Sequence, residues 1–145
     1  MADGLEVRGT SRSEESLAPI RAAGIEPALA DPLWPGTVLD LVGDVAVVLW
    51  ALGSAHTEAG EGGSVEAIHG DRLERLLERL VETPVRGFVY EASGSVDAEV
   101  LETGVRAVDA AAARWRIPAE TVVADASNPE RWVEEMAAAA ARLIG

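Results

Sequence analysis

The stretch Val45-Ala46-Val47-Val48-Leu49-Trp50 is the most hydrophobic run of the chain. Successive side chains of a β-strand point to opposite faces, so a run that is apolar at every position is typical of a strand covered on both sides. The glycine-rich segment 53–63 that follows it is typical of a surface loop. The run therefore predicts a central strand of a parallel sheet.

Strand and helix patterns alternate on the amino-terminal side of this run. Leu5-Glu6-Val7-Arg8 alternates apolar and charged residues, which predicts a half-buried strand ending at Arg8. Ser11 and Glu14 have the spacing of a capping box and predict a helix over 12–23. A weaker strand is expected over 25–30, followed by a helical turn near Trp34.

The same alternation continues on the carboxyl-terminal side. Leucines at helical spacing predict a helix over 71–81, and Phe88-Val89-Tyr90 predicts the next strand. A long helix over 96–115, a strand over 121–124 and a last helix capped by Ser127 complete the chain. The apolar stripe expected on that last helix consists of Val133, Met136, Ala140, Leu143 and Ile144.

Strands and helices that alternate in this way are typical of the α/β class, in which helices cover both faces of a parallel sheet. The length of 145 residues suits one domain. We therefore predict a single three-layer α/β domain over residues 1–145.

Composition excludes several function classes. The formal net charge of −13 repels a phosphate backbone, so nucleic acid is not an expected partner. The chain has no cysteine, and all 12 basic residues are arginine, which excludes thiolate, Schiff-base and phosphate-loop lysine chemistry. The sequence shows neither a signal peptide nor an apolar run long enough to span a membrane, so a cytoplasmic protein without membrane contact is expected.

The residues that follow the predicted strands are the candidate site, because open α/β sheets bind ligands at the carboxyl ends of their strands. Arg8-Gly9-Thr10-Ser11-Arg12 places two guanidinium groups around a turn at a helix start, an arrangement that favours an anion. In a dinucleotide-binding fold, arginine at this place accommodates a 2′-phosphate. An ordinary solvated turn explains the same residues equally well.

The chain resembles the NAD(P)-binding Rossmann domain of atypical short-chain dehydrogenase/reductase and nucleotide-sugar-epimerase-like proteins. The resemblance is carried by the run 8–12, by Gly24-Ile25-Glu26-Pro27 with Ala30-Asp31-Pro32, and by the segment 47–55. It implies that Arg12, with Arg8 and Thr10, meets the adenosine 2′-phosphate of NADP. It also implies that Asp31 lies near the adenine and that Gly53 lets the backbone approach the cofactor.

Two features depart from that family pattern. The sequence contains no Gly-x-Gly-x-x-Gly, and only four residues precede Leu5, where the resemblance implies a first strand and a glycine-rich pyrophosphate loop. Because that strand lies centrally in the resembled fold, its absence leaves two sheet edges that stay open or pair with each other. We expect an amino-terminally truncated domain, with a sheet closed around the gap as the alternative.

Catalytic residues are harder to assign. Ser93 or Ser95 lies where the resemblance implies a serine, but the helix over 96–115 has neither tyrosine nor lysine. Tyr90 and His69 are expected to be structural, and His56 is a candidate acid or base in the glycine-rich loop. Glu91 and Asp125 end neighbouring predicted strands, but without a paired histidine no metal site is expected.

The sequence thus favours an NAD(P)-binding Rossmann-like protein that prefers NADP and whose cofactor binding is impaired without a glycine-rich loop. The competing hypothesis is a catalytically silent Rossmann-like module that contacts a partner or forms a homodimer. In the resembled family, the helices corresponding to 71–81 and 96–115 pair in dimers. Their apolar stripes, or the open sheet edges, would then form the interface.

Overall fold

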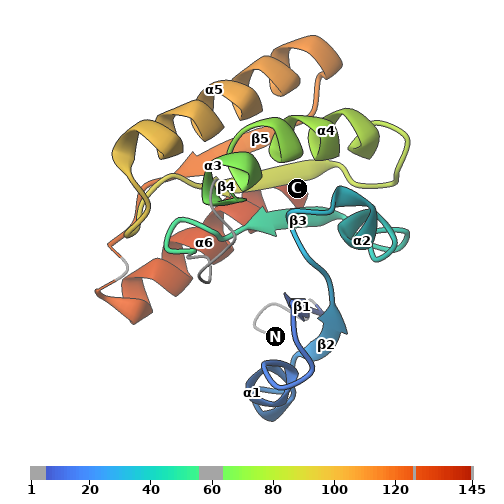
Figure 1. Cartoon of the computed structure of the whole chain (residues 1–145), viewed down its shortest axis with the longest axis vertical. Helices are drawn as coiled ribbons and strands as arrows, with labels where there is room; N and C mark the ends of the chain where they lie inside the picture. Colours follow the sequence, from blue (N-terminus) through green and yellow to red (C-terminus); the bar gives the residue numbers. More distant parts are fainter. Residues whose placement is uncertain (1–5, 56–63, 126, 145) are drawn as a thin grey trace.

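The computed structural model describes residues 6–55, 64–125 and 127–144. Strands and helices alternate along them as the sequence predicts, and α3 is the one addition (Figure 1). In chain order the elements are β1 (Arg8–Ser11), α1 (Leu17–Ala22), β2 (Glu26–Leu29), α2 (Pro35–Leu39), β3 (Val47–Trp50), α3 (Ser64–Ile68), α4 (Asp71–Leu80), β4 (Gly87–Glu91), α5 (Ala98–Trp115), β5 (Ala119–Val122) and α6 (Pro129–Ile144).

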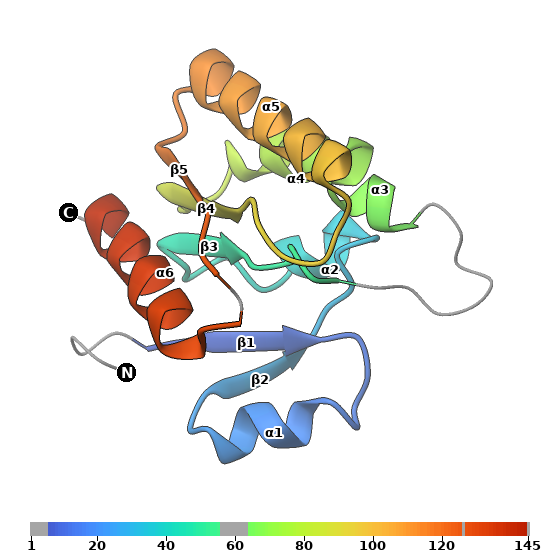
Figure 2. The same cartoon turned by 90° about the vertical axis from the view of Figure 1, so that its left-hand side faces the viewer.

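The strands form two parallel sheets. β1 pairs with β2, and β3, β4 and β5 form the second sheet in that order. β1 belongs to one sheet and β3 to the other, and both run in the same direction (Figure 2). No ladder joins these two strands within the described residues. The α/β class with parallel strands is confirmed. The alternative of a sheet closed around a gap is wrong for the described residues, because these two edges do not pair.

Helices cover both faces of the three-stranded sheet. α4 and α5 lie on one face, and α6 lies on the other (Figures 1 and 2). Trp50, Phe88 and Tyr90 point toward α4 and α5, where they form one core with the leucines of α4. Val89 and Met136 belong to a smaller core under α6. Because the strands within each sheet are parallel, their carboxyl ends lie at the same edge of that sheet.

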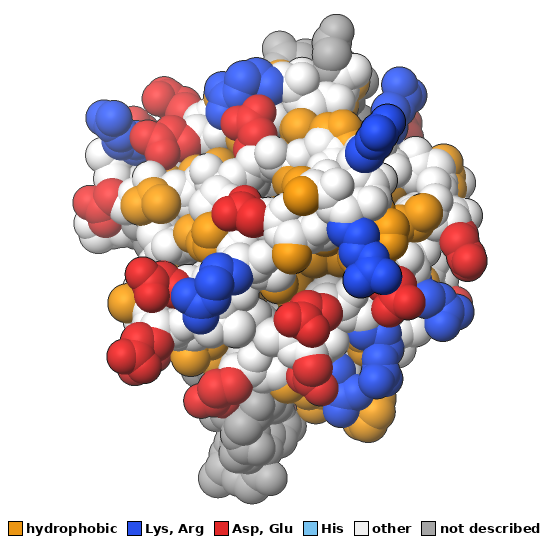
Figure 3. All heavy atoms as spheres, turned by 90° about the horizontal axis from the view of Figure 1, so that it is seen from above, with side chains coloured by type: hydrophobic (Ala, Val, Ile, Leu, Met, Phe, Trp, Pro, Cys, Tyr) orange, Lys and Arg blue, Asp and Glu red, His pale blue; other side chains and the backbone are white. Residues whose placement is uncertain are grey.

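The leucine stripe of α4 is buried as predicted, since Leu73, Leu76, Leu77 and Leu80 are at most 2% exposed. These side chains fill the core of the protein itself, so they are not available for the self-association that the sequence suggested. The outer surface above α4 and α5 instead mixes arginine, acidic and apolar side chains (Figure 3). None of the described helices combines the length and the hydropathy that a membrane span requires.

The first strand lies three residues further along than predicted. β1 covers Arg8–Ser11, so Gly9 and Thr10 continue the strand and do not end it. The ladder with β2 decides this, because it pairs Arg8 with Glu26 and Ser11 with Leu29. A Cβ at Gly9 would lie 3.0 Å from the Ile20 side chain, so the glycine allows α1 to pack closely.

The helix starts were predicted less well than the helices themselves. Ser11 belongs to β1, so the capping box with Glu14 does not form, and α1 begins at Leu17 after an N-cap without a side-chain hydrogen bond. At α6 the Asn128 side chain accepts from the Arg131 N–H at 3.3 Å, whereas Ser127 donates to Asp125. The stripe expected on α6 is partly wrong as well. Met136 is buried as predicted, but Val133 is 56% exposed, and Ala139 is buried where the prediction named Ala140.

Candidate functional site

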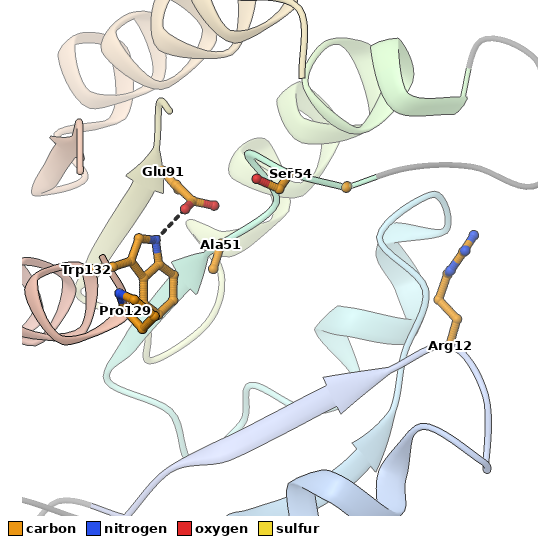
Figure 4. Close-up of a pocket in the computed structure, with 7 residues that line it drawn as sticks. Arg12, Ala51, Ser54, Glu91, Pro129 and Trp132 are labelled. Carbon is orange, nitrogen blue, oxygen red and sulfur yellow. Dashed lines mark hydrogen bonds between the residues drawn. The ribbon is translucent and has the colours of Figure 1, made fainter. Parts of the chain in front are cut away.

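A cavity of about 510 Å³ opens where β1, β3 and β4 end (Figure 4). Its wall comes from four parts of the chain that lie far apart in the sequence. The lining residues are Arg12, Ala51, Ser54, Ala55, Glu91, Pro129 and Trp132. Carboxyl ends of parallel strands are the usual ligand sites of open α/β sheets, and this cavity lies at such an edge.

Arg12 is the predicted site residue that lines this cavity. It follows β1 directly, and its exposed side chain lies across the opening from Trp132 (Figure 4). It is the only cationic side chain among the lining residues, so it supplies the positive charge of the described wall.

Arg8 lies at the other end of the same strand. Its guanidinium donates to the Leu41 carbonyl at 2.7 Å and pairs with Asp44 at 3.0 Å and with Glu26 at 3.4 Å. Hydrogen bonding to Asp44, and then to Glu26, raises the pKa of Arg8, and the same contact lowers the pKa of Asp44. Arg8 therefore ties β1 to the loop before β3 and does not line the cavity.

Thr10 and Asp31 also lie outside the cavity wall. Thr10 is exposed within β1, opposite Ala28. Asp31 holds the turn after β2, where its carboxylate accepts from the Leu33 N–H at 3.0 Å and its own N–H donates to the Thr37 hydroxyl at 2.8 Å. Its carboxylate thus orders the entry to α2.

Gly53 is buried beside the cavity, where the chain leaving β3 crosses the chain leaving β4. Its N–H donates to Glu91 Oε1 at 2.8 Å. A Cβ at Gly53 would overlap the Ser93 carbonyl oxygen, and one at Gly94 would overlap the Gly53 carbonyl. The need for glycine at position 53 therefore comes from the approach of two loops within the protein.

Glu91 holds the wall of the cavity together. This carboxylate at the end of β4 is only 3% exposed, and it accepts one N–H on each oxygen. Oε1 receives the Gly53 amide, and Oε2 receives the indole N–H of Trp132 (Figure 4). A buried carboxylate is tolerated where such donors satisfy it.

His69 and Tyr90 form a second pair of buried polar side chains, next to the chain that leaves β3. The His69 ring is fully buried, with Nδ1 2.5 Å from the Tyr90 hydroxyl and Nε2 2.9 Å from the Leu52 carbonyl. Since a carbonyl only accepts, Nε2 carries the proton and Nδ1 accepts from Tyr90. Burial lowers the pKa of His69, and burial together with the Glu91 charge raises the pKa of Tyr90. Both groups are therefore neutral at pH 7.

The remaining candidates form structural contacts or lie outside the described residues. The Ser93 hydroxyl donates to the Ala124 carbonyl at 2.7 Å and accepts from the Ala124 N–H at 3.0 Å, which connects the ends of β4 and β5. Asp125 accepts from the N–H and hydroxyl of Ser127. His56 lies outside the described residues. No group of three or more metal-ligating side chains occurs within the described part.

Sequence reasoning did not include Glu91 or Trp132 of the wall in the cofactor-binding set. Glu91 was considered only as a metal ligand beside Asp125, and Trp132 was given no role in ligand binding. These residues are 41 positions apart, and no local pattern links them. The signal that was available is the place of Glu91 at the end of a strand that is otherwise apolar.

No protein-family model and no curated protein matches the chain. A solved structure does: the crystal structure of the Citrobacter sp. triphenylmethane reductase complexed with NADP(H) matches with a TM-score of 0.56. The fold is Rossmann-like. The match covers 81% of this chain and 39% of that one at 15% identity, so it concerns the fold, and this chain spans well under half of the reductase's length.

Proposed function

We propose that the protein binds NADP in the cavity at the carboxyl ends of β1, β3 and β4, as a relative of atypical short-chain reductases and epimerases. The observation that carries the proposal is Arg12, which places a guanidinium after the first described strand and in the wall of the cavity. The fold likeness to a reductase complexed with NADP(H) supports the same ligand class.

The lining residues fit some parts of this cofactor and not others. Arg12 would hold the 2′-phosphate through charge-assisted hydrogen bonds, and Ala51 and Ala55 leave room for a ribose or a ring. Among the described lining residues no second cation is available for the pyrophosphate, and the sequence as given contains no Gly-x-Gly-x-x-Gly. We therefore expect weak binding with a preference for NADP over NAD. When bound, the cofactor would supply hydride-transfer chemistry.

Titration of NADPH fluorescence against the protein tests the proposal. We expect weak saturable binding that Arg12→Gln reduces roughly tenfold or more, because a hydrogen bond to a charged group contributes about 1.5–3 kcal/mol. Binding of NADH should not change in this variant. The matched control is Arg21→Gln, an exposed arginine at the end of α1. No NADPH binding, or equal affinity for NADPH and NADH in the wild type, would contradict the proposal, whereas tight NADPH binding would contradict only the expected weakness of binding.

A second candidate function is a non-catalytic interaction module. The observation that favours it is the pair of strand edges on β1 and β3 that no ladder occupies within the described residues, because open edges are templates for pairing with another chain. Light scattering on the same samples separates the two functions. A monomer that binds NADPH supports the first function, and a dimer that does not respond to cofactor supports the second.

A further inference from the structure

We infer that Trp132 is a stacking surface for the heteroaromatic ring of a nucleotide, and that Glu91 is the positioning residue that holds it. The inference rests on the proposed function and deepens it, because it assigns the place of a ring inside the cavity. Neither residue belongs to the predicted cofactor-binding set, and the comparisons assign a role to neither.

The hydrogen bond of Trp132 determines what this side chain offers to a ligand. The indole N–H is its only polar group, and Glu91 Oε2 already accepts it. What Trp132 contributes to the cavity wall is therefore aromatic carbon surface. Such a surface attracts planar rings and does not select among their polar edges.

Glu91 fixes the orientation of that surface. Its carboxylate is buried and its other oxygen is held by the Gly53 N–H at 2.8 Å, so it does not turn away without leaving a donor unpaired. Trp132 is also packed against the small core under α6. The ring is thus held in place before a ligand arrives, which lowers the entropy cost of binding.

The opposite wall supplies the charge. Arg12 lies across the cavity from Trp132, with the small residues Ala51 and Ser54 between them (Figure 4), and Ala55 also lines the cavity. A ligand that joins a planar ring to an anionic group matches both walls. The adenosine and the nicotinamide halves of the dinucleotide share this chemistry, and the experiment distinguishes them.

Isothermal titration of three probes tests the inference: adenosine 2′-monophosphate, nicotinamide mononucleotide and ribose 5-phosphate, which has no ring base. We expect Trp132→Ala to weaken one of the two base-containing probes about tenfold, in line with the effect of losing one base–aromatic stack. Trp132→Phe should restore most of that affinity, and binding of ribose 5-phosphate should not change. The probe that responds identifies the half of the dinucleotide that stacks.

Trp34→Ala is the matched control, because Trp34 is 56% exposed, carries Arg72 5.2 Å from its ring centre and is not part of the cavity wall.

Glu91→Gln tests the positioning role. In Glu91→Gln, the ultraviolet resonance Raman band of an indole N–H that is strongly hydrogen-bonded to a carboxylate should disappear. The same band should be missing from Trp132→Phe, which assigns it to Trp132. A spectrum of Glu91→Gln identical to the wild type would overturn the role of Glu91.

Intrinsic fluorescence keeps the test decisive if Trp132→Ala does not fold. The responding probe should quench the emission of the wild type and leave that of Trp132→Phe almost unchanged. If NADPH and the probes bind and depend on Arg12, but quenching and affinity are indifferent to position 132, the stacking inference is wrong and the proposed function stands. If the wild type binds neither NADPH nor any probe, both fail.

Discussion

Arg8 and Arg12 are four positions apart, and the structure gives them different tasks. Arg12 follows the carboxyl end of β1 and lines the cavity, whereas Arg8 opens the strand and pairs with Asp44 and Glu26. A strand rises about 3.3 Å per residue, so the four steps from Arg8 to Arg12 separate these two residues by roughly 13 Å along the chain. The shift of β1 relative to the sequence-based strand therefore separates the two arginines of one predicted anion site: Arg12 lines the cavity, and Arg8 forms structural ion pairs.

His69 makes the stability of the protein depend on pH. Its folded-state pKa is lowered by burial, so the unfolded chain binds a proton first as the pH falls below about 6.5. This contribution is fully present above that pH and is lost as the pH falls toward the folded-state pKa. We expect the free energy of unfolding, measured in urea, to fall between pH 7 and pH 5 by at most about 1.4 kcal/mol per pH unit.

The variant His69→Gln should lose this slope whatever its absolute stability. His56→Gln is the matched histidine control and should keep the slope. Carboxylates with lowered pKa values, such as Asp125 and Glu120, take up most of their protons below pH 5 in both the folded and the unfolded chain, so they add little to this slope. A slope that persists in His69→Gln would show that another group is responsible.

At the scale of elements, the crossing of the loops after β3 and β4 shapes the site. Gly53 and Gly94 meet there without side chains, and Ser93 connects the end of β4 to that of β5. The crossing brings the Gly53 amide to Glu91, and Glu91 in turn holds Trp132 of α6. One close backbone approach thus connects three elements to the cavity wall.

We expect Gly53→Ala to destabilise the protein by about 1–3 kcal/mol, the range for forcing extra atoms into a packed site. The added Cβ overlaps the Ser93 carbonyl, which is backbone and yields only if the loop moves. Chemical denaturation measures the loss. Gly43→Ala is the control, since a Cβ there meets no atom within 4 Å. Equal stability of the two variants would contradict the close crossing.

The identity of most elements was predictable from local pattern, while their exact ends were not. The leucine spacing of α4 and the apolar run of β3 are properties of a few consecutive residues, and both predicted the right kind of element. The prediction that the apolar run is a central strand is wrong for the described residues, because β3 lies at the edge of its sheet, β4 is central, and Leu49 is 44% exposed. The start of α1 and the bounds of β1 depend on the ladder with β2, which lies 18 residues away. Capping patterns such as Ser11 and Glu14 do not reveal whether a neighbouring strand already uses one of the residues.

At the scale of the whole molecule, the described residues form one part with extensive hydrophobic cores and a second part with few buried apolar side chains. Both hydrophobic cores of the described residues lie around β3, β4 and β5. β1, β2 and α1 form a small layer that Arg8 ties to the rest through Leu41 and Asp44. Exposed ion pairs contribute little to stability in water, so this layer depends chiefly on its own limited packing.

Native-state hydrogen exchange should reveal this division. We expect amides of β1 and β2 to exchange at least tenfold faster than those of β4, because local opening requires less free energy where few apolar contacts are lost. β4 is buried at every position and is paired on both edges, which makes it the internal reference. Uniform protection across the five strands would show that the two sheets unfold together.

The sequence by itself determined the α/β class, the order of strands and helices, and the placement of an arginine after the first strand. These follow from periodicity and composition, which act over a few residues. Only the tertiary structure decided that the β1 and β3 edges stay unpaired within the described residues, and that Glu91 meets Trp132. Both depend on contacts between distant segments, whose free energy is set by packing of the folded chain and leaves no local pattern in the sequence.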